Sequence, residues 1–171
     1  MRDRPHFVGL GWRASGAAFL IGFLAGCSGI KTYPNGLDKN LLVHTSTDSA
    51  SILSRVRASL SISNVDAQCR IQYEGTVDLD RNAIPIGIPV ERWSYLVFDF
   101  SSSGLLANST TMAQATLLKP RAGYRYDIEV TYRDDLYNVV IRESRPGTTH
   151  ARDIDLKRLD ACQHSAEVSS G

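Results

Sequence analysis

Side chains that could carry out acid–base or metal chemistry are few in this sequence, and they are widely spaced. Beyond residue 26 the histidines are His44, His150 and His164, and none belongs to a His-x-x-x-His or Glu-x-x-His arrangement. The sequence also lacks a Gly-x-Ser-x-Gly elbow, a phosphate-cradling loop and a nucleotide fingerprint. We therefore expect no enzymatic activity, although a catalytic triad assembled by folding stays open.

Two pairs of carboxylates are the remaining candidates for a metal site. Asp78 and Asp80 share one side of a predicted strand, and Asp134 and Asp135 form a predicted turn. A Ca²⁺ site needs several oxygen ligands that converge from loops. Solvated strand faces and turns are the commoner explanation for such pairs, so we predict no metal and no cofactor.

The first 26 residues have the layout of an export signal. Their positive charge comes from Arg2, Arg4 and Arg13. An apolar segment of 11 residues follows from Ala14 to Leu24, well short of the roughly 20 residues that cross a bilayer as a helix. We predict a cleaved signal peptide over residues 1–26; a single transmembrane anchor is the alternative.

The stretch Leu24-Ala25-Gly26-Cys27, at the end of the apolar segment, resembles the lipobox of bacterial lipoproteins. The resemblance implies that Cys27 becomes the N-terminus and carries a thioether-linked diacylglycerol and an N-acyl chain such as palmitate. Lipid chains contribute about 0.8 kcal/mol per buried CH₂, so two or three chains hold a small domain on a membrane. In such lipoproteins the residue after the cysteine helps to sort the protein, and Asp there favours retention at the inner membrane. Ser28 at this position therefore implies the outer membrane of a Gram-negative envelope. An ordinary signal with a chance cysteine nearby is the other interpretation.

The remaining two cysteines, Cys69 and Cys162, are predicted to form a disulfide, because an exported chain folds in an oxidising compartment. Two buried free thiols are the alternative. The leader takes three of the 19 Lys and Arg residues and one of the 18 Asp and Glu residues, which leaves 16 basic and 17 acidic residues. Without a basic cluster, nucleic-acid binding is not expected.

Alternation of apolar and polar residues predicts strands through most of the chain after residue 39. The expected strands are 40–45, 56–63, 69–80, 92–100, 124–133, 136–143 and 152–159. The third strand is predicted to place Cys69 on its apolar, inward face. Pro85 and Pro89 assign residues 84–89 to a sheet edge or a rim loop. Residues 101–114 are small and polar, and we predict a connection there.

The strand over residues 92–100 carries aromatic side chains on both faces. Leu96, Phe98 and Phe100 share the predicted core face, and Trp93 and Tyr95 lie on the other. Trp93 and Tyr95 would form a platform for a glycan or a protein partner if that face is open. They would be structural if it is covered.

The segment before residue 125 carries a Leu-x-Pro pattern followed by a tyrosine, at Leu118, Pro120 and Tyr124. This resembles the loop before strand F of fibronectin type III domains, where a tyrosine corner ties the strand to the loop. The resemblance covers about 15 residues, implies a sandwich and is silent on ligands.

Together these patterns predict an all-β protein, an antiparallel β-sandwich of 7–9 strands, Ig-like or transthyretin-like. The expected organisation is a signal peptide over 1–26, a short tether over 27–39, the sandwich over 40–162 and a polar tail over 163–171. The expected function is that of an envelope lipoprotein of structural or protein-interaction type, bound to the membrane and to another envelope protein. The alternatives are a glycan- or small-ligand-binding module that uses Trp93 and Tyr95, and a cell-envelope hydrolase.

Overall fold

The computed structural model describes residues 29–47, 54–104, 110–133 and 136–162, and these residues form an all-β structure. It contains nine strands: β1 Leu41–Thr47, β2 Ser54–Val65, β3 Ile71–Asp78, β4 Ala83–Ile86, β5 Trp93–Gly104, β6 Thr110–Leu118, β7 Arg125–Arg133, β8 Leu136–Ser144 and β9 Ala151–Ile154. The prediction of an all-β protein is confirmed.

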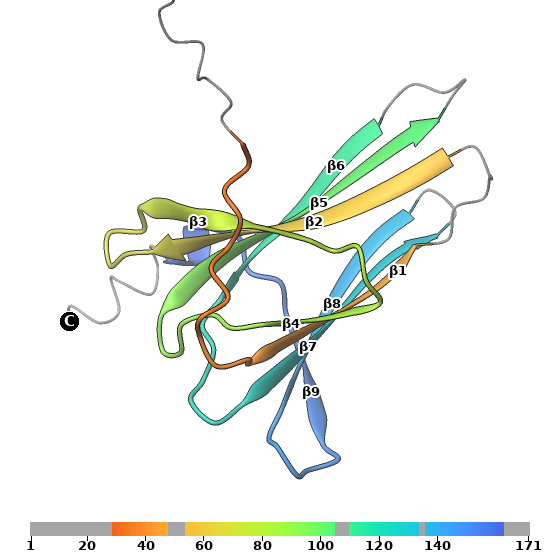
Figure 1. Cartoon of the computed structure of the whole chain (residues 1–171). Coiled ribbons are helices and arrows are strands. Elements are labelled where there is room, and N and C mark those ends of the chain that lie inside the picture. Colours follow the sequence, from red (N-terminus) through yellow and green to blue (C-terminus); the bar gives the residue numbers. More distant parts are fainter. Residues whose placement is uncertain (1–28, 48–53, 105–109, 134–135, 163–171) are drawn as a thin grey trace, which may run out of the picture.

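The strands form two sheets that pack face to face (Figure 1). Sheet A has the order β3-β2-β5-β6 and sheet B the order β4-β1-β7-β8-β9. All neighbours are antiparallel except β1 and β7, which run parallel from the Leu41–Tyr126 pair to the Thr47–Tyr132 pair. In the constant-type Ig arrangement the first, second, fourth and fifth strands share one sheet. Here β1 and β4 lie in the opposite sheet from β2 and β5, so the sandwich does not have the constant-type Ig arrangement of strands.

The core between the sheets follows the predicted alternation. Sheet A contributes every second residue of β2 and β5, and sheet B contributes every second residue of β1, β7 and β8. The fully buried members include Val43, Leu60, Ile62, Leu96, Phe98, Phe100, Ile128, Val130 and Ile141. Side chains on the inner faces of two packed sheets are buried, and they alternate with outward-facing polar residues along each strand. This is why the apolar–polar alternation is clear in these strands.

Strand β3 departs from the predicted alternation because it contains a bulge. Its pairing with β2 shifts between Ile62 and Ser63, which leaves Glu74 as an extra residue. A bulge of one residue turns the side chains beyond it to the other face. Gly75 is buried toward the core as predicted. Ile71 and Tyr73 instead lie on the outer face of sheet A, each 44 % exposed, which corrects the prediction of one apolar face from 69 to 79.

The β5–β6 hairpin is longer than its sequence indicates. Residues 101–104 continue β5, and residues 110–114 already belong to β6, where a connection is expected from the sequence. The pairing runs without interruption from Ser94–Leu118 to Ser102–Thr110. The first four residues of β6 are exposed, so they show no apolar alternation that could reveal a strand.

Two other predictions concern sheet B. The segment with Pro85 forms β4, an edge strand, as the prolines indicate. The last strand is shorter than expected, because β9 ends at Ile154.

Residues 31–33 of the predicted tether are part of the folded domain. The amide of Thr76 donates to the carbonyl of Lys31 (2.8 Å), and the amide of Tyr33 donates to the carbonyl of Thr76 (3.0 Å). The Tyr33 ring is buried, and its hydroxyl donates to the carbonyl of Gly87 (3.0 Å). The segment therefore covers part of the outer edge of β3. In Figure 1 it crosses that strand before it continues to β1.

We predict that Gly75→Ala weakens this docking. A Cβ at Gly75 would lie 2.6 Å from both Cα and N of Tyr33, and the φ angle of +151° is one that residues with a side chain rarely adopt. The free energy of unfolding, measured by urea titration, should fall by more than about 1 kcal/mol. Gly36→Ala is the matched control, because a Cβ there meets nothing within 4 Å. Equal stability of the two variants would contradict the docking.

Candidate functional site

The predicted lipobox lies outside the described residues, so lipidation of Cys27 stays a prediction. Within the described residues no helix is long and apolar enough to span a membrane.

The disulfide prediction is confirmed: Cys69 and Cys162 are bonded, with their Cα atoms 5.9 Å apart and a sequence separation of 93. Its position differs from the expected one. Cys69 does not point into the core from a strand, but sits at a φ of 59° in the turn that joins β2 to β3. The bond ties this turn to the C-terminal segment on the outer face of sheet A, where a second apolar cluster forms around it.

Trp93 and Tyr95 lie on the outer face of sheet A, as predicted, but they belong to this second cluster. Both rings are half-buried and pack with the disulfide and Leu117. The C-terminal segment is bound there by two hydrogen bonds, from the Leu117 amide to the Lys157 carbonyl (2.8 Å) and from the Lys157 amide to the Thr116 hydroxyl (3.0 Å). The Lys157 ammonium lies 5.6 Å from the centre of the Trp93 ring. This packing gives both rings a structural role.

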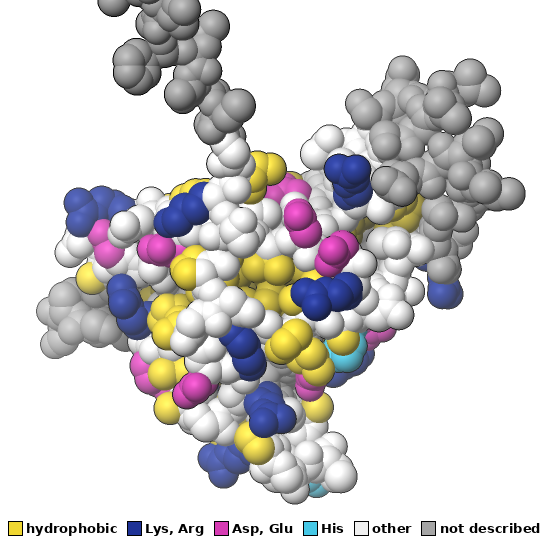
Figure 2. Space-filling view, in the orientation of Figure 1, with side chains coloured by type: hydrophobic (Ala, Val, Ile, Leu, Met, Phe, Trp, Pro, Cys, Tyr) yellow, Lys and Arg dark blue, Asp and Glu magenta, His cyan; other side chains and the backbone are white. Residues whose placement is uncertain are grey.

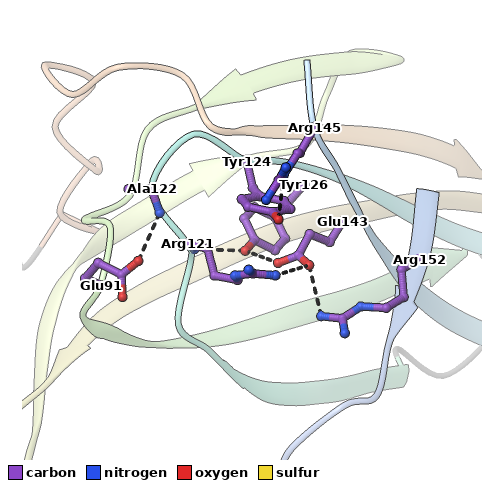
Figure 3. A network of polar contacts seen from close by, with 8 residues as sticks. All are labelled: Glu91, Arg121, Ala122, Tyr124, Tyr126, Glu143, Arg145 and Arg152. Atoms are coloured by element: carbon purple, nitrogen blue, oxygen red, sulfur yellow. Dashed lines mark hydrogen bonds and ion pairs between the residues drawn. The ribbon is translucent and has the colours of Figure 1, made fainter. Parts of the chain in front are cut away.

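A buried carboxylate, Glu143, forms the centre of a polar network that sequence reasoning missed (Figure 3). Its side chain is 5 % exposed. It accepts hydrogen bonds from the Tyr126 hydroxyl (2.6 Å), from Arg152 (2.9 Å) and from Arg121 (3.3 Å). The inward series Tyr137, Val139, Ile141 continues to residue 143, so the alternation itself already placed this glutamate inside.

The corner tyrosine is Tyr126, two residues beyond the predicted Tyr124. The backbone amide of Arg121 donates to its hydroxyl (2.9 Å), which ties β7 to the loop that precedes it. Tyr124 is partly exposed and lies between the guanidinium groups of Arg121 and Arg145, at 4.2 and 5.0 Å from its ring centre (Figure 3). Leu118 and Pro120 are buried at this corner, as the pattern indicates. The start of β7 decides the outcome: Tyr124 precedes the strand, and Tyr126 is the first residue of β7 that points into the core.

The chemistry of this network is that of a structural junction. Two guanidinium groups balance the charge of Glu143, and a buried charge with such partners avoids the cost of an isolated one. Burial, and then the hydrogen bond to Glu143, raise the pKa of Tyr126 to about 12. The junction joins β7, β8, β9 and the loop after β6 at one end of the sandwich.

The other candidates for chemistry do not converge. His44 and His150 are exposed on separate elements, and His164, Asp134 and Asp135 lie outside the described residues. Asp78 and Asp80 are exposed at the end of β3 and beyond it. Among the described residues no three His, Cys, Asp or Glu side chains are grouped as metal ligands.

The outer edge of β6 is the feature of the described surface best suited to binding. The Leu117 amide points away from β5 and donates to the Lys157 carbonyl. In an antiparallel pair such as β5 and β6, backbone groups alternate in direction, so every second residue before Leu117 also turns its amide and carbonyl away from β5. These residues are Thr111, Ala113 and Ala115, and no hydrogen bond from these groups to another described residue is found. Charged residues and prolines usually protect an edge strand from pairing with another chain. Residues 110–116 contain neither.

The other edges are better protected within the described part of the chain. The N-terminal segment covers β3 at Thr76, β4 contains Pro85, and β9 has only four residues. Strand β8 extends beyond β9 from Leu136 to Val140. This stretch lies at the same end as the free part of β6, because Phe100, the partner of Met112, contacts Tyr137 with 4.5 Å between ring centres.

Within the described residues, the site and fold thus define a disulfide-linked two-sheet β-sandwich in which β6 has a long edge without a protecting charge or proline. No protein-family model, curated protein or solved structure matches the chain. Its function must therefore be argued from its own residues.

We predict that loss of the disulfide destabilises the protein substantially. In the chain-entropy model, a link across 93 residues is worth roughly 4 to 5 kcal/mol. Reduction should lower the unfolding midpoint in urea, followed by Trp93 fluorescence. The Cys69→Ser/Cys162→Ser double variant should match the reduced wild type and should not respond to reductant. A double variant as stable as the oxidised wild type would refute the expectation.

We predict a stability contribution from Tyr126 that disappears at alkaline pH. Because folding raises its pKa from 10.0 to about 12, the contribution is complete below pH 10 and is lost as the pH rises toward 12. That interval corresponds to roughly 2 to 3 kcal/mol. Urea titrations across this pH range should show a steeper loss for the wild type than for Tyr126→Phe.

Tyr124→Phe is the control, because its hydroxyl lies at the surface. Tyr126→Phe should also cost about 1 to 3 kcal/mol at neutral pH, since the Arg121 amide and Glu143 each lose a partner. Parallel pH profiles for all three proteins would show that the Tyr126 hydroxyl does not titrate as expected.

Proposed function

We propose that the protein is a membrane-anchored lipoprotein of the cell envelope, without catalytic activity, that binds another envelope protein through the free edge of β6. The observation that carries the proposal is this edge, whose outward backbone groups are unpaired among the described residues. Envelope location rests on the lipobox at Cys27, and Ser28 supports the outer membrane. The Cys69–Cys162 disulfide fits an oxidising compartment outside the cytoplasm.

The proposed mode of binding is strand addition. In this mode an extended segment of the partner pairs with an exposed sheet edge, its backbone hydrogen bonds give affinity, and alternate side chains give specificity. The edge residues Thr111, Ala113 and Ala115 have small side chains that let another strand approach. Met112, 48 % exposed, and Leu136, 73 % exposed, offer apolar contacts at the same end of the sandwich.

The glycan-binding alternative has weaker support, because Trp93 and Tyr95 are held in the disulfide cluster beneath the C-terminal segment. The hydrolase alternative is weaker still. Glu143, the most buried carboxylate among the described residues, is already balanced by two arginines and a tyrosine hydroxyl.

The test is site-specific photocrosslinking in native membranes. A photoreactive residue at Thr111, in the full-length protein, should capture a reproducible partner that mass spectrometry identifies. The same residue at Thr149, exposed in the turn between β8 and β9, is the surface control. Capture that is equal at both positions, or absent at Thr111, would refute binding through the edge.

Proline substitution separates the edge from the fold. Ala113→Pro removes only an outward amide, so we expect the protein to keep its unfolding midpoint and to lose the Thr111 crosslink. Gln114→Pro removes an amide that pairs with β5, and we expect it to destabilise the hairpin. A crosslink that persists in Ala113→Pro would exclude strand addition.

A further inference from the structure

We propose that Ile30, Ile71 and Tyr73 form a contact surface for membrane lipid, next to the anchored end of the chain. The inference rests on the proposed lipidation of Cys27. It adds that the domain touches the bilayer with a defined face instead of moving freely on a tether.

The first argument is the short reach of the chain. The carbonyl of Lys31 accepts hydrogen bonds from the Thr76 amide (2.8 Å) and from the Tyr73 hydroxyl (3.3 Å), so Lys31 is fixed to β3. Cys27 precedes it by four residues, which span at most about 14 Å when fully extended. A lipid on Cys27 therefore holds the Lys31 side of the domain at the bilayer surface.

The second argument is the apolar character of the surface at that point. Ile30 is 77 % exposed, and Ile71 and Tyr73 are each 44 % exposed. The bulge at Glu74 is what turns Ile71 and Tyr73 outward, because an unbroken strand would point them to the core side. Figure 1 shows the N-terminal segment leaving the domain beside β3, and Figure 2 shows hydrophobic side chains along both sides of this segment.

The third argument is that the polar groups here are already satisfied. The Tyr73 hydroxyl has partners in Thr76 (2.7 Å) and the Lys31 carbonyl. Lys31 pairs with Glu74 (3.8 Å), and Arg70 pairs with Asp66 (2.7 Å). Burial against the headgroup region therefore leaves no isolated charge. A tyrosine with an apolar ring and a satisfied hydroxyl is the kind of side chain that favours a membrane interface.

The experiment uses the full-length, processed protein in vesicles whose acyl chains are brominated. Tyr73→Trp places a fluorophore in the proposed contact, and Ile71→Trp is a second reporter that leaves the Tyr73 hydrogen bonds in place. Thr149→Trp is the control, in the turn that Figure 1 places at the end away from the N-terminal segment. The protein without these substitutions gives the background of Trp93, because Trp12 is removed with the leader.

We expect the tryptophan at 73 and that at 71 to lose fluorescence in brominated relative to ordinary vesicles, and the tryptophan at 149 to keep it. Mass spectrometry of the N-terminal peptide first establishes whether Cys27 carries diacylglycerol. Absence of the lipid would overturn the proposed anchor and the contact together. A lipidated protein in which positions 71 and 73 are quenched no more than position 149 would overturn the contact alone.

Discussion

The pairing of residues 31–33 with Thr76 is the interaction on which the rest of this structure depends. It closes the exposed edge of β3 at its middle and inserts Tyr33 into the core, where the hydroxyl reaches Gly87 near the end of β4. Two glycines make this possible: a side chain on Gly75 would collide with Tyr33, and one on Gly87 would lie 2.5 Å from the carbonyl oxygen of Leu37. The N-terminal segment is thus held between β3 of sheet A and the end of β4 of sheet B. If Cys27 carries the proposed lipid, this pairing sets the distance between the domain and the membrane.

The junction around Glu143 is held by polar contacts instead of close backbone packing. Glu143 collects donors from β7, β9 and the loop after β6, and it does so beneath the point where the chain crosses from sheet A to sheet B. A partly satisfied buried network would cost more than an apolar core. Here the carboxylate, the corner hydroxyl and the Arg121 amide all have partners, so the crossing is fixed in one geometry.

The strands with one buried face were predictable from the sequence. The bulge in β3 and the exposed part of β6 were not. Alternation in β2, β7 and β8 predicted the core correctly, because each inner face meets the other sheet. The bulge in β3 was not predictable, since Tyr73 and Glu74 fit an unbroken alternation. The start of β6 was missed for a related reason: its first four residues are exposed, so no apolar period marks it. Glu143 was predictable, because it continues the alternation of Tyr137, Val139 and Ile141 that points into the core.

Sheet A separates the two proposed contacts. Strands β3 and β6 are its opposite edges, with β2 and β5 between them. Three strand spacings of about 4.8 Å place these edges roughly 14 Å apart along the sheet. Among the described residues, the N-terminal segment covers the β3 edge, and the C-terminal segment reaches the β6 edge at Thr116 and Leu117. A partner strand on Thr111 and Ala113 would therefore extend sheet A on the side away from the anchor, so membrane contact and partner binding would not compete for the same backbone groups.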